Sequence, residues 1–193
     1  MANSSPASAS PARLRLALPA DVAVMEALIA RSGIELSAGF YTPEQAEAVT
    51  RFVFGVDSQL VADGTYFLIE QDGEVVACGG WSKRNTLFGG DQTKSGPDPL
   101  LDPAREAARI RAFFVAPHMA RRGLGRQLMR HCSAQAALAG FRTLELAATM
   151  PGVPLYLASG FAVVEEFELN LPGNVAVPLS RMRRSIGGAI AAL

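Results

Sequence analysis

The sequence predicts a single α/β domain, in which a β-sheet is flanked by helices. Three observations carry this prediction. From Arg13 onward, segments with the two-residue alternation of strands exchange with segments of helical spacing. The pair Asp72-Gly73 stands between two apolar runs, which is typical of a β-hairpin. At 193 residues the chain is long enough for one well-buried core and short for two independent ones.

The first part of the domain is predicted as one strand and two helices. Residues 13–18 alternate as a strand, and residues 21–30 carry apolar side chains at helical spacing. The run Thr42-Pro43-Glu44-Gln45 supplies a capping threonine, a proline at the first helical position and a glutamine that closes a capping box. A second helix should therefore cover residues 43–54.

The hairpin comes next, followed by a long connection. Strands are predicted over residues 65–71 and 74–81, because Asp-Gly supplies the positive φ angles that a two-residue turn requires. Residues 83–105 are polar and rich in Gly, Pro and Asp. A connection of this length inside a compact domain is usually functional or disordered, and both interpretations stay open.

Residues 109–129 are the most informative part of the chain, because an apolar strand runs through a short turn into a glycine-punctuated helix start. The backbone N–H groups of residues 121–126 have no partner in the helix they begin and lie at the positive end of its dipole. Gly123 and Gly125 permit close approach of a ligand and positive φ. Three arginines add charge-assisted donors for phosphate: Arg121, Arg122 and Arg126.

This turn predicts an anion-binding cradle for a diphosphate. Leu124, Leu128 and Met129 give the following helix an apolar face that can dock on the sheet. A P-loop would need a Gly-Lys-Ser/Thr ending, and a dinucleotide fold would need three spaced glycines and a later acidic residue, and neither pattern is present. The alternative is a plain turn with a solvated basic edge.

The last strands follow the cradle helix. Gly140 serves as the C-cap of that helix, and a strand is predicted from Arg142 onward. A final strand pair is predicted over residues 161–169 and 176–183. The expected organisation is a disordered leader, one domain and a tail, at residues 1–12, 13–184 and 185–193. An organelle transit peptide is the alternative for the leader, which is poor in acids.

Four segments, in order and at the usual spacing, resemble the GNAT superfamily of acyl-CoA-dependent N-acetyltransferases: Phe113-Phe-Val-Ala-Pro, Ala120-Arg-Arg-Gly-Leu-Gly-Arg-Gln-Leu, Gly140-Phe-Arg-Thr-Leu-Glu-Leu and Tyr156-Leu-Ala-Ser-Gly-Phe-Ala-Val-Val. The resemblance is strongest over residues 109–164. It implies a mixed, mostly antiparallel central sheet flanked by helices, with acyl-CoA bound between two splayed parallel strands. It also implies that acetyl-CoA is the cosubstrate.

The resemblance assigns the cofactor contacts. The backbone of Phe113, Phe114 and Val115 would pair with the pantetheine arm as an extra strand, although core packing remains the alternative role of their side chains. The cradle would hold the pyrophosphate through Arg121, Arg122, Gly123, Leu124, Gly125 and Arg126. Thr149 stands where the family often has a cofactor-contacting Asn, and Ala120 stands where it usually has Gln or Arg.

Tyr156 is the candidate general acid. The resemblance places its hydroxyl, on a short helix over residues 152–159, toward the cofactor sulfur. A phenol with a pKa near 10 can protonate or hydrogen-bond the departing thiolate. The alternative is a tyrosine whose ring only packs against the following strand. By family geometry, the N–H of Val115 would stabilise the oxyanion of the tetrahedral intermediate.

The general base is not assigned by the sequence. Some family members have Glu at the position of Arg109, and an arginine cannot accept a proton. A water chain, Glu106, Glu145 or an amine of low pKa are the open alternatives. His118 and His131 are expected to be surface or packing residues.

The acceptor side is predicted only in outline. Phe40 and Tyr41 lie in a segment that overhangs the acceptor site in the family, and they either line the pocket or form a hydrophobic staple for the second helix. Trp81 is either a pocket wall or a core aromatic residue. Residues 85–103 are expected to be an acceptor-site flap, with a plain surface excursion as the alternative.

We therefore expect direct transfer of an acetyl group from acetyl-CoA to a primary amine of a small molecule or peptide. A non-catalytic acyl-CoA-binding module and a transferase of longer acyl groups remain alternatives. Cys78 and Cys132 show no metal-ligand spacing, so no metal is expected, and two lone thiols fit a reducing, cytoplasmic compartment. Balanced charge argues against nucleic acid, and no apolar run is long enough to cross a membrane. A homodimer is left open.

Overall fold

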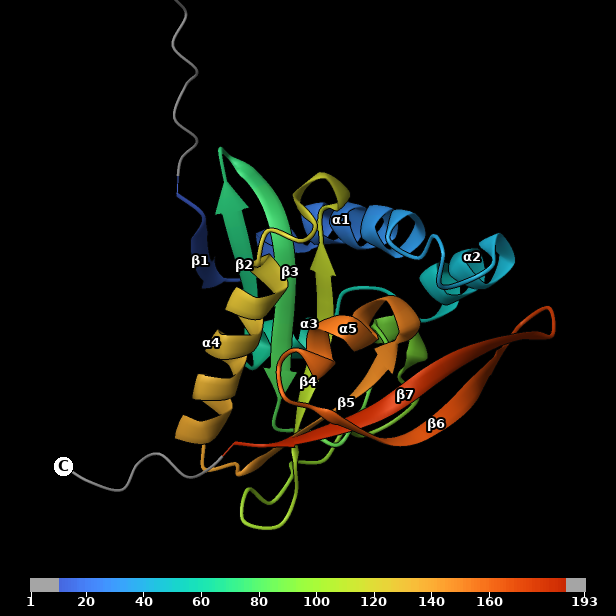
Figure 1. Ribbon diagram of the computed structural model, residues 1–193. Helices are drawn as coiled ribbons and strands as arrows, with labels where there is room; N and C mark the ends of the chain where they lie inside the picture. The colour runs from blue at the N-terminus through green and yellow to red at the C-terminus, as the bar shows by residue number, and fades with distance from the viewer. Residues whose placement is uncertain (1–10, 187–193) are drawn as a thin grey trace, which may run out of the picture.

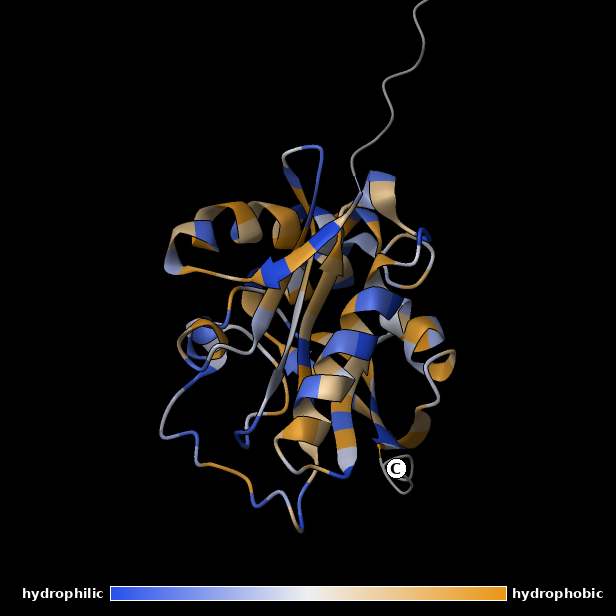
Figure 2. Cartoon of the chain, turned by 90° about the vertical axis from the view of Figure 1, so that its left-hand side faces the viewer, coloured by the Kyte–Doolittle hydropathy of each residue, from blue (hydrophilic) through white to orange (hydrophobic). Residues whose placement is uncertain are grey.

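The computed structural model of the protein describes residues 11–186 (Figure 1). Most of the leader expected at residues 1–12 and of the tail expected at residues 185–193 therefore lies outside the described residues. The described chain forms one layered α/β unit with helices on both faces of a central sheet (Figures 1 and 2).

The sheet has seven strands in the order β1-β2-β3-β4-β5-β7-β6. The strands are β1 Arg13–Leu16, β2 Tyr66–Gln71, β3 Glu74–Ser82, β4 Ala108–Val115, β5 Thr143–Thr149, β6 Ala162–Leu171 and β7 Val175–Ser185. Within it β4 and β5 are parallel, and all the other neighbouring pairs are antiparallel. The prediction of a mixed, mostly antiparallel sheet is confirmed.

Five α-helices accompany the sheet in the described part of the chain: α1 Val22–Glu35, α2 Pro43–Phe52, α3 Ser58–Ala62, α4 Leu124–Leu138 and α5 Val153–Leu157. Single 3-10 turns lie at η1 Pro19–Asp21, η2 Asp91–Thr93, η3 Pro117–Met119 and η4 Met150–Gly152. Helices α1 and α4 both pack on β3 and β4, from opposite faces of the sheet (Figure 2). Helix α2 packs on the β6–β7 hairpin.

Helix α2 begins as its capping signature predicts. Thr42 Oγ1 accepts from Gln45 N at 3.2 Å, and Gln45 Oε1 accepts from Thr42 N at 3.1 Å. The helix ends at Phe52, two residues before the predicted end, where the N–H groups of both following residues converge on Val49 O. Val49 O thus accepts two N–H groups at the end of the helix, and the chain turns away.

Two helix predictions need correction. Helix α1 runs to Glu35 rather than to residue 30, because Gly33 lies in its interior at the contact with α2, where a Cβ would come within 2.6 Å of Thr50 Oγ1. Helix α3 was not predicted. It begins at Asp57, whose carboxylate accepts from Gln59 N at 3.0 Å and so caps the helix.

The buried side chains form two clusters. The larger lies between the sheet and helices α1 and α4. Trp81 belongs to it and packs edge-on against Phe141, with the ring centroids 6.1 Å apart. This contact settles Trp81 as a core aromatic residue. The smaller cluster lies under α2 and contains Tyr41 together with Ala46, Val49 and Val177. Among the described helices, none is both long and apolar enough to span a bilayer.

Candidate active site

Strands β4 and β5 form a fork. They pair only at Ala108 with Leu144 and at Arg109 with Glu145. Beyond this point β4 bulges, because its register against β3 gains one residue, and Ala112 adopts a φ of 54° within the irregularity. The edge of β4 after Arg109 consequently faces a gap instead of β5, and strand backbone left unpaired in this way is available to another extended chain.

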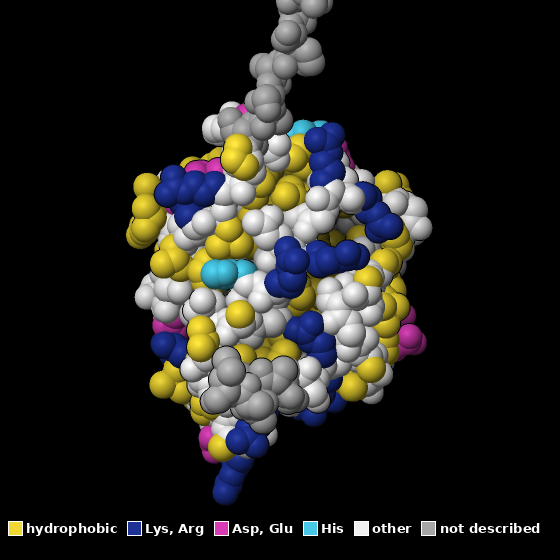
Figure 3. Space-filling model, turned by 60° about the vertical axis from the view of Figure 1, so that its left-hand side comes forward, with side chains coloured by type: hydrophobic (Ala, Val, Ile, Leu, Met, Phe, Trp, Pro, Cys, Tyr) yellow, Lys and Arg dark blue, Asp and Glu magenta, His cyan; other side chains and the backbone are white. Residues whose placement is uncertain are grey.

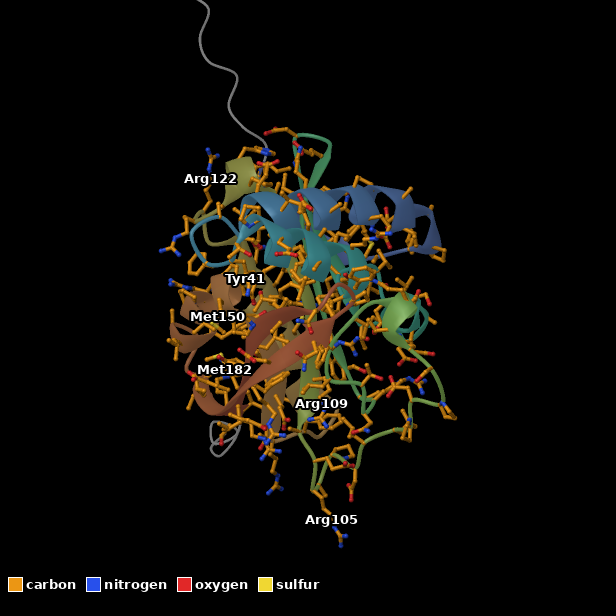
Figure 4. All side chains as sticks on the ribbon, turned by 90° about the vertical axis from the view of Figure 1, so that its right-hand side faces the viewer. Tyr41, Arg105, Arg109, Arg122, Met150 and Met182 are labelled. Carbon is orange, nitrogen blue, oxygen red and sulfur yellow. The ribbon has the colours of Figure 1, made fainter. Side chains whose placement is uncertain are left out.

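An ion cluster closes the narrow end of the fork. Glu145 is 4% exposed, and its carboxylate lies 3.2 Å from Arg109 Nη1 and 2.6 Å from Arg183 Nε. Two arginines thus hold this buried carboxylate in place. Figure 4 shows Arg109 at the opposite end of the molecule from Arg122 of the cradle turn.

Neither carboxylate considered as a general base lies in the pocket described below. Glu145 is engaged in the ion cluster, and Glu106 is exposed, where it accepts from Asp102 N at 2.6 Å. His118 is exposed, with its Nε2 3.4 Å from Glu74 Oε2, and His131 packs edge-on against Phe67. Both histidines are the surface or packing residues that the sequence predicts.

The three residues expected to pair with pantetheine occupy the open arm of the fork. Phe113, Phe114 and Val115 are all half-buried. The Phe113 ring covers Gly79, where a Cβ would come within 2.4 Å of it, and the Phe114 ring meets Phe54 edge-on at 5.0 Å. Their side chains therefore pack, and their backbone borders the gap, so packing does not exclude the expected pairing with pantetheine.

The cradle turn between β4 and α4 presents free amides. Gln127 N donates to Gly123 O at 2.9 Å, whereas the amides of residues 121–126 have no acceptor within the described part of the chain. Arg121 and Gly123 both have left-handed φ values, of 64° and 89°, on either side of Arg122. Such alternation curves successive N–H groups into an anion-binding concavity, here at the start of α4.

The two glycines of the cradle have different roles. Gly123 has the positive φ that the sequence predicts, and a Cβ there would meet open space. The positive φ predicted for Gly125 is wrong, because this residue is helical. A Cβ there would lie 2.9 Å from Leu155 Cδ2. Gly125 allows α5 to pack against α4, while the buried Leu124 side chain anchors the turn.

The basic side chains of the cradle face solvent. Arg121, Arg122 and Arg126 are exposed, and no carboxylate of the described residues pairs with them. Figure 3 shows Lys and Arg side chains gathered, with few acidic ones, on the face that carries α4. Figure 4 shows Arg122 extending away from the body of the protein. This region is therefore electropositive and suited to phosphate groups.

Tyr156 lies on the other side of the fork, on α5. It is buried, with its ring 5.9 Å from that of Phe161 and 6.5 Å from that of Phe113, and it lines a pocket at the mouth of the fork. Gly152 makes room for it, since a Cβ there would lie 2.9 Å from the ring. Burial raises the pKa of Tyr156, with a further contribution from the Cys132 thiol, so the hydroxyl keeps its proton at neutral pH.

The pocket joins the fork to a second region. Its fork side is formed by residues 110–114 of β4 and by Ala147, Thr149 and Tyr156, and its far side by residues 53–55, residues 87–90 and Leu179. Residues 87–90 belong to the predicted flap. Residues 53–55 were not predicted to contribute, because they follow a helix end and carry no motif.

Arg111 is the polar centre of the pocket wall and was also missed. Its side chain is 1% exposed, and Nη2 donates to Asp57 Oδ2 at 2.8 Å. Nη1 donates to Thr86 O at 2.7 Å and Nη2 also donates to Gly89 O at 2.5 Å, while Lys94 pairs with the other oxygen of Asp57. Burial lowers the pKa of Arg111 and the Asp57 charge opposes this. An arginine inside an apolar strand is the signal that could have revealed it, since a buried charge needs a partner.

The two aromatic residues expected to overhang the site lie outside the pocket lining. Phe40 is half exposed, and Tyr41 is buried in the cluster that contains Ala46 of α2. The Tyr41 hydroxyl donates to Pro178 O at 2.7 Å and accepts from Met150 N at 3.0 Å, a contact visible in Figure 4. The structure therefore favours the staple interpretation for Tyr41.

The cysteines are buried and free. Burial raises the pKa of the Cys78 thiol to about 12 and raises that of Cys132 as well. Such thiols are poor nucleophiles at neutral pH. No group of three or more His, Cys, Asp and Glu side chains that could hold a metal ion occurs among residues 11–186.

Solved structures of acetyltransferases share this fold. A GCN5-related N-acetyltransferase from Rhodopseudomonas palustris superposes with a TM-score of 0.65 at 20% identity, over 92% of this chain and 97% of the other. The putative acetyltransferase yncA from Salmonella typhimurium, solved with its cofactor acetyl-CoA, gives 0.60 at 15% identity over 95% and 98%. The PaiA N-acetyltransferase from Thermoplasma acidophilum, solved with coenzyme A, gives 0.62 at 12% identity over 92% and 100%.

The sequence itself provides the assignment. No curated protein matches the chain. The model of the acetyltransferase (GNAT) family matches residues 34–161, which are more than half of the chain and include the fork, the cradle turn and Tyr156. The chain belongs to the acetyltransferase (GNAT) family.

Proposed function

We propose that this protein transfers an acetyl group from acetyl-CoA to the nitrogen of a primary amine on a small molecule or peptide. One observation carries the proposal: a path runs along the chain from the free amides of residues 121–126 to the open edge of β4, and Phe113 and Phe114 of this edge line the same pocket as Tyr156. The acetyl-CoA and coenzyme A in the yncA and PaiA structures support the choice of cosubstrate.

The proposed cosubstrate contacts follow that path. The amides of residues 121–126 bind the pyrophosphate, and the exposed side chains of Arg121, Arg122 and Arg126 add charge. The pantetheine arm lies in the fork, paired with the backbone of residues 113–115 and facing Thr149 on β5. Thr149 is a suitable neighbour because it lines the pocket and its side chain makes no capping hydrogen bond in η4.

The proposed reaction is a direct attack. The lone pair of the amine nitrogen attacks the thioester carbonyl carbon, and the resulting oxyanion accepts from Val115 N–H. The C–S bond then breaks, the electron pair stays on sulfur, and the thiolate takes the proton of the Tyr156 hydroxyl or a hydrogen bond from it. The nitrogen loses its proton to water, and water restores the proton of Tyr156.

The test is release of free thiol from acetyl-CoA with a panel of primary amines. Replacing the acid, Tyr156→Phe, should lower kcat by about 10²- to 10⁴-fold, because positioned proton transfer contributes a factor of this size. The KM for acetyl-CoA should change little. Tyr66→Phe is the matched control, since it also removes a buried hydroxyl but lies on β2 outside the pocket lining. Equal rates in the two variants would remove Tyr156 from the mechanism.

A non-catalytic acyl-CoA-binding module is the second candidate. The observation that favours it is the engagement of Arg109 and Glu145 with each other, at a position where a proton acceptor would be useful. This candidate predicts tight binding of acetyl-CoA without thiol release for any amine. A cytoplasmic location, a homodimer and the boundary at residue 184 stay predictions.

A further inference from the structure

Phenylalanine rings line the pocket on both of its sides. Phe54 and Phe114 meet edge-on with their centroids 5.0 Å apart, and Phe88 stands opposite on the connection between β3 and β4, backed by Phe167 at 6.3 Å. Leu87 and Leu179 also line the pocket. The part of a guest that covers these rings must be apolar, because a polar group placed against them would lose its hydrogen bonds to water without gaining a partner.

The charged side chain in the lining of this pocket is a cation. Arg111 contributes its guanidinium, whose orientation is fixed by Asp57 and by the carbonyls of Thr86 and Gly89. Asp57 compensates this charge, and no carboxylate of residues 11–186 lines the pocket, so a second ammonium group brought into this weakly hydrated space finds no anionic partner. The wall therefore disfavours acceptors with several ammonium groups and tolerates one amine that reaches the thioester uncharged.

The wall is also preorganised. Gly90 N donates to Val53 O at 2.9 Å, and Gln92 Nε2 donates to Phe54 O at 2.6 Å. A Cβ on either Gly55 or Gly90 would come within 2.7 Å of the Gln92 side chain, so the two backbone segments are in close contact. The connection is thus joined to residues 53–55, and the shape of the pocket exists before any ligand arrives.

We propose that the acceptor is a small primary amine attached by a short linker to an aromatic ring, with the ring seated among Phe54, Phe88 and Phe114. The amine then points back toward the fork, where the thioester would lie. This inference rests on the proposed acetyl transfer and names the substrate class of the same site. Offset or edge-on contacts between rings supply the selectivity.

The experiment compares thiol release from acetyl-CoA with benzylamine, 2-phenylethylamine, spermidine and lysine. We expect kcat/KM for the two aromatic amines to exceed that for spermidine and lysine by at least about tenfold, because only the aromatic amines carry a ring that can contact the phenylalanine rings of the pocket. Phe88→Ala should raise the KM for 2-phenylethylamine about tenfold with the KM for acetyl-CoA unchanged, and Phe88→Leu should recover part of the loss.

Phe40→Ala is the matched control, because Phe40 is half exposed and lies outside the pocket lining. It should leave both KM values unchanged. Calorimetric titration of CoA-saturated wild-type protein with 2-phenylethylamine gives a second measurement that needs no variant to fold. We expect saturable heat with this amine and none with spermidine.

The failures are distinguishable. Faster turnover of spermidine or lysine than of the aromatic amines would overturn the substrate class and leave the proposed acetyl transfer intact. Faster turnover of octanoyl-CoA than of acetyl-CoA, without binding of 2-phenylethylamine, would show that the pocket holds an acyl chain and would overturn the class as well. Binding of acetyl-CoA without thiol release for any amine would overturn the proposed function and this inference together.

Discussion

The two halves of the candidate site are built from different parts of the chain. The proposed cofactor half consists of backbone: free amides at residues 121–126 and the unpaired edge of β4. The acceptor half consists of side chains that come from three separated segments, residues 53–55, 87–90 and 110–114. Backbone features depend on local conformation and tolerate many side chains, whereas a side-chain pocket changes with every substitution. One scaffold can therefore keep its cosubstrate and vary its acceptor.

The largest expected effect on the free energy of unfolding comes from a substitution in the acceptor half alone. Arg111→Met removes a buried cation and leaves Asp57 with Lys94, so we expect a loss of about 3 kcal/mol in the free energy of unfolding, at the lower end for broken buried pairs. Urea denaturation measures this as a lower midpoint with an unchanged slope. Binding of CoA should stay within about threefold of wild type, because the cradle is remote.

The control for this prediction is Arg183→Met, which removes an ion pair from an arginine whose side chain is about half exposed. It should cost no more than about 1 kcal/mol. A wild-type midpoint for Arg111→Met would show that the Arg111–Asp57 pair does not stabilise the acceptor wall.

The next effect tests the packing role of the second cradle glycine. Gly125→Val places side-chain atoms against Leu155, so α5 must shift, at an expected cost of about 1–3 kcal/mol in unfolding free energy. Because α5 carries Tyr156, kcat should fall while CoA still binds. The double variant Gly125→Val/Leu155→Ala opens the missing space and should restore much of the stability. No recovery in that variant would contradict the proposed contact.

Gly123 provides the counterpart on the backbone side. Gly123→Ala meets no neighbour, but its left-handed φ costs an L-residue about 1–2 kcal/mol, so the turn should partly relax and its amides should turn away. We expect the Kd for CoA to rise about tenfold, with thermal stability nearly unchanged, as measured by calorimetry and thermal unfolding. Gly96→Ala is the control, since that glycine has open space and an ordinary φ. Unchanged affinity in Gly123→Ala would mean that the conformation of this turn is irrelevant to binding.

Features that depend on neighbouring residues could be predicted from the sequence, whereas contacts between distant segments could not. Asp72 and Gly73 have positive φ, Thr42 and Gln45 form their capping box, and Gly123 has its left-handed turn, because each depends on a few neighbouring residues. The Arg111–Asp57 pair spans 54 positions, and nothing local connects its members. The packing role of Gly125 was missed for a related reason, since its neighbour Leu155 lies on another helix.

The smallest expected effect is a pH dependence that stays flat. Burial raises the pKa of Tyr156 above its ordinary value of 10, so the hydroxyl remains protonated as the pH rises to that value. Its ionisation should therefore remove no activity between about pH 8 and pH 10. A profile of kcat for thiol release checks this. An alkaline loss within this window that is present in wild type and absent from Tyr156→Phe would contradict the assignment.

We propose that free backbone amides at the start of α4 bind the pyrophosphate of the cosubstrate. Amide proton and nitrogen NMR shifts of residues 121–126, followed during titration with CoA and separately with pantetheine, test it most directly. We expect large, saturable shifts for these amides with CoA and small ones with pantetheine, which lacks the pyrophosphate. Equal shifts with both ligands, or unmoved signals with CoA bound elsewhere on the protein, would contradict it.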